Sequence, residues 1–155
     1  MRRGAPIRRR SADRLKFDSG GIPEVPGHGL YADLLYASGV MTTSALATVE
    51  VLRALIVAHR TRRIRLPALE VLLDRLRTEI AECELIHVIP LDPEPTLARA
   101  VELVGQHCLG TLDAIHLAVA DRDGRALAGD DELVFVTADV VQGQAAAALG
   151  MTVRP

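Results

Sequence analysis

Four acidic residues occupy positions that a solvent-exposed carboxylate seldom takes: Asp18, Glu50, Asp113 and Asp139. Asp18 and Asp139 each follow a short β-type segment, Asp113 lies in the apolar stretch 111–118, and Glu50 falls at the edge of the apolar face of an expected helix. Carboxylates packed together repel one another and take up protons unless a cation neutralises them. Mg²⁺ or Mn²⁺ prefers such oxygen ligands, and the bound ion can activate water against a phosphodiester. If the fold brings these residues together, their chemistry suits a metal-dependent hydrolytic site.

The elements that must position this site alternate between strands and helices. The pattern predicts strands over 15–17, 39–43, 85–89, 133–137 and 152–153, helices over 30–37, 44–60, 67–82, 93–106, 111–120 and 140–149, and a polar loop over 121–132. Such alternation is typical of an α/β fold with a parallel sheet and helices on both faces. Function in such sheets lies beyond the carboxyl ends of the strands, which is where Asp18 and Asp139 fall.

Apolar residues at helical spacing predict which faces of the helices are buried. The stripes are Ala45, Val49, Leu52 and Ile56 in the first long helix, Leu69, Leu72, Leu76 and Ile80 in the second, and Leu97, Val101 and Val104 in the third. The helix 111–120 is apolar nearly all round, so we expect it to be buried.

The composition indicates one globular domain. The chain has 155 residues, of which 49% are hydrophobic and 25% charged, and no apolar run reaches the ~18 residues of a membrane span. Cys83 and Cys108 are too few for a disulfide framework, so we expect two reduced thiols in a cytoplasmic protein.

Charge is distributed unevenly along the chain. Residues 1–16 carry a net charge of +6, whereas the remaining residues carry −8. The basic arm has two interpretations: a segment that binds nucleic acid, or an upstream extension with no folded role. We expect residues 1–14 to lie outside the fold and residues 15–155 to form the domain.

Three segments, in this order, resemble a known family. They are Thr43–Leu55 (TSALATVEVLRAL), Thr111–Ala120 (TLDAIHLAVA) and Phe135–Asp139 (FVTAD), and together they look like a PIN-domain ribonuclease of the VapC toxin type. The resemblance covers about residues 30–155. It implies a PIN-like (Rossmann-like) parallel sheet and a metal-dependent endoribonuclease that acts as the toxin of a type II toxin–antitoxin pair. It also implies Mg²⁺ (or Mn²⁺) as cofactor, RNA as substrate, a VapB-type antitoxin as partner and a homodimer.

The resemblance assigns the family's acidic residues to Glu50, Asp113 and Asp139. The first aspartate of the family pattern is matched by Asp18, but Gly20-Gly21-Ile22-Pro23 stands where the family continues into an apolar helix. A helix cannot continue through that sequence. We therefore expect a site with fewer firmly held ligands than is usual, weak metal binding, and RNA cleavage that is low or absent.

Each candidate also has a purely structural interpretation. Asp113 can complement a helix dipole, Glu50 can pair with Arg53, Asp139 can cap a helix, and Asp18 can be a turn residue. His116, three residues after Asp113, can be a satisfied core histidine. The basic residues Arg60, Arg62, Arg63 and Arg65 are either a solvated helix end or weak contacts to RNA phosphates.

Two other functions compete with the ribonuclease. One is a non-catalytic PIN-fold module that binds the antitoxin without cutting RNA. The other is a Rossmann-like nucleotide binder, which needs a glycine-rich phosphate loop after the first strand; Gly20-Gly21 followed by Pro23 suits that role poorly.

Overall fold

The computed structural model describes residues 40–82 and 86–154, with the side chains of 79–82 left aside, and shows a mixed α/β chain. In order the elements are β1 (Met41–Ser44), α2 (Ala45–Arg60), α3 (Leu66–Glu82), β2 (Ile86–Ile89), α4 (Pro93–His107), α5 (Thr111–Val119), the π-helical turn η1 (Ala120–Gly124), α6 (Arg125–Ala128), β3 (Val134–Val136), α7 (Val140–Ala148) and β4 (Thr152–Arg154). No helix in this part of the chain is long and apolar enough to cross a membrane. The strand expected at 15–17 and the helix expected at 30–37 lie outside the described residues.

The strands pair in parallel, as the sequence predicted, but in two small sheets. β1 pairs with β2, which places Ser44 opposite Ile89, and β3 pairs with β4, which places Val134 opposite Thr152. The expectation of one continuous parallel sheet is therefore not met within the described residues, where each sheet has two strands. Strands of three or four residues form few ladder bonds, so the helices dominate the packing.

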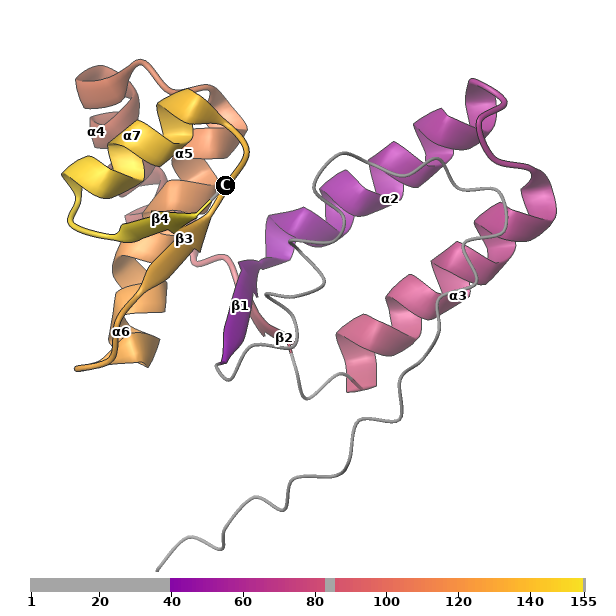
Figure 1. Cartoon of the computed structure of the whole chain (residues 1–155), viewed down its shortest axis with the longest axis horizontal. Coiled ribbons are helices and arrows are strands. Elements are labelled where there is room, and N and C mark those ends of the chain that lie inside the picture. Colours follow the sequence, from indigo (N-terminus) through magenta and orange to yellow (C-terminus); the bar gives the residue numbers. More distant parts are fainter. Residues whose placement is uncertain (1–39, 83–85, 155) are drawn as a thin grey trace, which may run out of the picture.

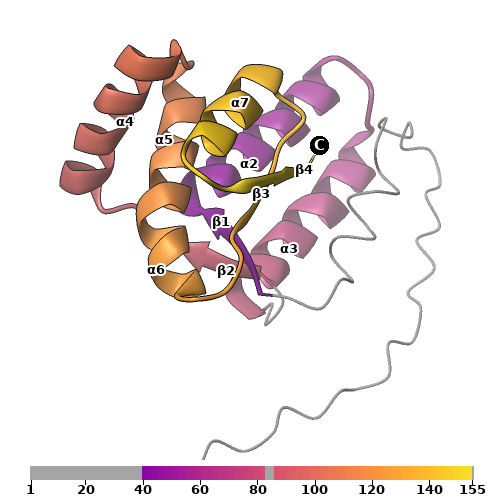
Figure 2. The ribbon, with the colours of Figure 1, turned by 60° about the vertical axis from the view of Figure 1, so that its left-hand side comes forward.

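Helix α5 lies at the centre of the core, which confirms the prediction from its all-round apolar sequence. Ala114, Leu117 and Ala118 are fully buried, and α4 and α7 pack against this helix. Two further alanines, Ala145 and Ala146 of α7, belong to the same cluster. Because alanine side chains are short, the backbones of the helices can approach closely. Figures 1 and 2 show α4, α5 and α7 together, with the hairpin of α2 and α3 beyond β1 and β2.

Helix α4 buries a different face from the one predicted. Its buried residues are Thr96, Ala100 and Leu103, whereas Leu97 and Val101 of the predicted stripe are 46% and 73% exposed. Both sets of residues recur at helical spacing. The small side chain of Ala100 fits against α5 better than branched Val101 would, so tertiary packing decided between the two faces.

Helix α2 is also less buried than its pattern predicted. Val49 and Leu52 are exposed, and no residue of α2 is buried. Leu46, in its first turn, packs against the core, and Leu69 of α3 is buried. The hairpin of α2 and α3 therefore meets the rest of the described chain mainly through its end nearest β1 (Figure 1).

The prediction of a polar loop over 121–132 is wrong for residues 121–128, which are helical. The helix of α5 continues through η1 into α6, because ion pairs compensate for the polar sequence. Asp121 accepts hydrogen bonds from Arg99 of α4 and from Arg125 one turn later, at 3.0 and 2.8 Å. The pKa of Arg99 is raised by its hydrogen bonds to Glu102 and Asp121. These contacts hold α4 against the extended helix.

Truncation of buried Leu103 tests which face of α4 packs inward. We expect Leu103→Ala to lower the free energy of unfolding by about 2–5 kcal/mol, because it leaves a cavity in the core. Val101→Ala, on the face predicted from sequence, is the matched control and changes stability by less than about 0.5 kcal/mol. Urea unfolding of both variants measures the difference. A larger loss for Val101→Ala would show that the stripe read from the sequence is the buried one.

Candidate functional site

Three elements meet at a histidine on the core helix. Ser44 is the last residue of β1, Glu50 lies in the second turn of α2, and His116 lies on α5. The Ser44 Oγ is 2.8 Å from His116 Nδ1, and His116 Nε2 is 2.5 Å from Glu50 Oε2. Residues 66 and 72 positions apart in sequence are thus joined by hydrogen bonds at the carboxyl end of β1.

The position of Ser44 in the chain explains this contact. Ser44 is the N-cap residue of α2, but its hydroxyl makes no capping bond to the helix and bonds His116 instead. The partner of Glu50 is His116, whereas Arg53 is exposed. The interpretation of Glu50 and Arg53 as a local ion pair is therefore wrong.

Asp113 precedes His116 by one helical turn and lies in the first turn of α5. Its half-buried carboxylate folds back over the start of the helix, where Gly110 is the N-cap residue. A Cβ on Gly110 would lie 2.8 Å from Asp113 Oδ2, so the glycine provides the space in which the carboxylate sits. The Asp113 side chain makes no hydrogen bond to another described residue, and its oxygens remain available to a ligand.

Asp139 caps helix α7, as one of its two interpretations predicted. Its Oδ1 accepts a hydrogen bond of 2.8 Å from the backbone N–H of Gln142. Buried Gln142 in turn donates from its amide to the backbone oxygen of Asp113 at 3.2 Å and accepts from Thr137 Oγ1 at 2.7 Å. Gln142 therefore ties the start of α7 to the start of α5.

The structure thus connects the three predicted acidic residues that it describes. Glu50 is linked through His116 to the helix of Asp113, and the backbone oxygen of Asp113 is linked through Gln142 to the exposed carboxylate of Asp139. Asp18, the fourth, lies outside the described residues. Among residues 40–82 and 86–154, no group of three or more His, Cys, Asp or Glu side chains could hold a metal ion. The donors present are carboxylate oxygens, which suit Mg²⁺, an ion that keeps several waters and binds through one or two carboxylates.

Sequence patterns do not identify Ser44 or Gln142 as site residues, and they predict only a structural role for His116. A serine directly before a helix predicts a cap, and a glutamine in an alanine-rich helix predicts an exposed residue. One signal was present: His116 is the only charged or polar residue between Ala114 and Val119, on a helix expected to be buried. A histidine there needs partners for its ring nitrogens.

The four basic residues Arg60, Arg62, Arg63 and Arg65 lie exposed around the turn between α2 and α3. Arg62 has a positive φ of 61°, which allows the chain to reverse direction there. Ten residues of helix separate Glu50 from Arg60, a distance of about 15 Å along α2. The distance along α2 from the basic turn to Glu50 is therefore comparable to the length of a few nucleotides of an RNA strand.

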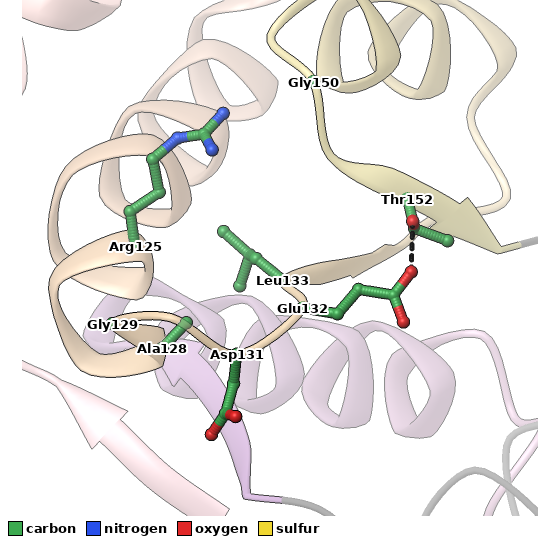
Figure 3. Close-up of a pocket in the computed structure, with 8 residues that line it drawn as sticks. All are labelled: Arg125, Ala128, Gly129, Asp131, Glu132, Leu133, Gly150 and Thr152. Atoms are coloured by element: carbon green, nitrogen blue, oxygen red, sulfur yellow. Dashed lines mark hydrogen bonds between the residues drawn. The ribbon is translucent and has the colours of Figure 1, made fainter.

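A hollow of about 260 Å³ lies elsewhere on the molecule (Figure 3). Two of its polar side chains already have partners: Glu132 accepts from Thr152 at 2.6 Å, and Arg125 bonds Asp121 and the backbone oxygen of Leu149. None of the predicted site residues that the structure describes lines it. The lining residues are Arg125, Ala128, Gly129, Asp131, Glu132, Leu133, Gly150 and Thr152.

Comparison with known proteins gives no family assignment for this chain. No protein-family model matches it, and no curated protein shows a significant sequence match.

Two variants of Asp139 separate its capping role from a role of its charge. Asp139→Ala should cost about 0.5–2 kcal/mol in the free energy of unfolding, because the N–H of Gln142 loses its acceptor. Asp139→Asn should stay within a few tenths of a kcal/mol of the parent, since asparagine caps helices about as well. Thermal unfolding measures both. Equal losses in the two variants would mean that the charge, rather than the cap, stabilises α7.

Proposed function

We propose that this chain is a PIN-like, metal-dependent endoribonuclease that acts as the toxin of a type II toxin–antitoxin pair in the cytoplasm. The observation that carries the proposal is the meeting of Glu50 with the helix of Asp113 through His116. The two acidic residues come from separate parts of the sequence, and each sits in a segment that resembles the PIN family. Gln142 adds Asp139 to the same chain of contacts.

The residues that would hold Mg²⁺ or Mn²⁺ are Glu50 and Asp113, with Asp139 and Asp18 as further candidates. Oε1 of Glu50 and both carboxylate oxygens of Asp113 bond no other described residue, so hard oxygen donors are free. A bound divalent ion would supply a more acidic water and stabilise negative charge on the phosphodiester. The protein's own residues hold the carboxylates: His116 fixes Glu50, and Gly110 leaves room for Asp113.

The basic turn between α2 and α3 supports a polyanionic substrate. Arg60 and Arg63 are exposed at and just beyond the C-terminal end of α2, about 15 Å along the helix from Glu50. Lys and Arg side chains hold nucleic acids through their phosphates without reading sequence. An RNA strand placed on this surface would reach the acidic residues.

The second candidate is a non-catalytic PIN-like module that binds an antitoxin. The exposed apolar residues of α4, Leu97, Val101 and Val104, favour a protein-binding surface, and Leu112 of α5 is exposed as well. Apolar groups at the surface favour association with a partner, either an antitoxin of the VapB type or a second copy of the chain. RNA cleavage separates the two candidates.

Asp113→Asn tests the catalytic proposal. We expect it to abolish metal-dependent RNA cleavage, and toxicity on expression, while the protein stays folded, because asparagine keeps the shape but not the charge. Cleavage of a labelled RNA with Mn²⁺ is the measurement. Cleavage by the parent that survives Asp113→Asn would contradict the role of this carboxylate, and a parent that never cleaves RNA would favour the binding module.

Gly110→Ala offers a sharper variant, because it displaces the Asp113 carboxylate without removing it. The added Cβ meets Oδ2, the far end of a flexible side chain, so the side chain moves at small cost to stability. Cleavage should fall while the fold persists. Gly105→Ala is the matched control, since its Cβ meets nothing within 4 Å.

Removal of two arginines tests the proposed path of the RNA. The double variant Arg60→Ala/Arg63→Ala should raise KM for RNA several-fold with little change in kcat. The lost contacts to phosphates would stabilise bound RNA equally in the ground state and the transition state, and the reacting groups are unchanged. Its affinity should also depend less steeply on salt. Kinetics at two salt concentrations measure both effects, and Arg60→Lys/Arg63→Lys is the charge-conserving control. An unchanged KM would place the RNA on another surface.

A further inference from the structure

We infer that His116 and Ser44 are positioning residues that orient the carboxylate of Glu50. The serine hydroxyl and the carboxylate bond opposite nitrogens of one imidazole ring, at 2.8 and 2.5 Å. Within the described residues, these are the side-chain hydrogen bonds that join β1 and α2 to the helices of the core. The ring therefore sets where Glu50 stands relative to Asp113. The importance of that placement for metal binding rests on the proposed function.

Serine, histidine and an acidic residue also form the nucleophilic triad of hydrolases. Here, however, the serine is the buried residue and the acid is the exposed one. In such a triad the serine must reach substrate and the acid is buried behind the histidine. Ser44 is only 5% exposed, whereas the side chain of Glu50 is 41% exposed. The serine is therefore the anchor, and the carboxylate is the group presented to solvent.

The hydrogen bonds also determine where the ring carries its proton. An ionised carboxylate can only accept, so the short contact to Glu50 requires a proton on His116 Nε2. Nδ1 can then accept from the Ser44 hydroxyl. Glu50 Oε2 is engaged by the ring, and Oε1 is left as the oxygen that can meet a ligand.

The first test reads the ring of His116 in the full chain without metal or RNA. Long-range ¹H–¹⁵N correlation of the labelled protein distinguishes the two ring nitrogens. We expect a proton on Nε2 in the parent, with a change in the ring signals in Ser44→Ala and none in Thr43→Ala, a variant of the same strand. A neutral ring with its proton on Nδ1 alone would overturn the inference, because that ring cannot donate to Glu50.

The second test is a double-mutant cycle between Ser44 and Glu50, which bond the ring and not each other. We expect the effects of Ser44→Ala and Glu50→Ala on the unfolding equilibrium constant to deviate from additivity by at least about threefold. The deviation should disappear when His116 is replaced by Phe. Additive effects would show that the ring does not couple Ser44 and Glu50 energetically, which would contradict the inference.

The third test connects positioning to the proposed site. By calorimetry, Ser44→Ala should weaken Mn²⁺ binding about tenfold, the usual scale for a group that supports a ligand. Ser44→Thr, which keeps the hydroxyl, should restore it. Unchanged Mn²⁺ affinity in a parent that binds the ion would refute the positioning role. If the parent binds no Mn²⁺, the proposed function fails, and the ring proton and the cycle still decide whether His116 orients Glu50.

Discussion

The arrangement of the site depends on the imidazole of His116, a polar ring on a helix that is otherwise built to be buried. Ala114, Leu117 and Ala118 fix α5 in the core, so most of the ring, whose side chain is 20% exposed, is removed from water. A desolvated polar group without partners is costly. Ser44 and Glu50 supply those partners, and in doing so they dock the end of β1 and the start of α2 against the core.

The small side chains of the core make this docking possible. Alanines on α4, α5 and α7 let the three helices approach closely, which brings the starts of α5 and α7 within reach of one glutamine. Gln142 then fixes the N-terminal turn of α5 from one side while His116 fixes its middle from the other. Asp113 makes the first of these contacts through its own backbone oxygen and lies one turn before His116, so its backbone is held on a fixed part of α5.

The sequence predicted the elements better than their faces or contacts. Helical spacing, together with the cap interpretation of Asp139, placed most of the described helices and strands within one or two residues. The face of α4 could not be read from sequence, because Leu97 and Leu103 both belong to apolar stripes and only the packing of Ala100 distinguishes them. The contact between His116 and Glu50 could not be predicted from sequence either. Arg53, three residues after Glu50, is the local candidate for a partner, whereas His116, the observed partner, lies 66 residues away.

Paramagnetic broadening by Mn²⁺ tests the central claim, that the Glu50 carboxylate held by His116 and the Asp113 carboxylate one turn earlier on α5 form a metal site. In ¹H–¹⁵N spectra of the full chain, traces of Mn²⁺ should broaden the amides around Glu50 and Asp113 first, because relaxation by the ion falls steeply with distance. Asp113→Asn should remove that selectivity. Broadening centred instead on the acidic loop at Asp130–Glu132, or spread evenly over the acidic surface, would contradict the account.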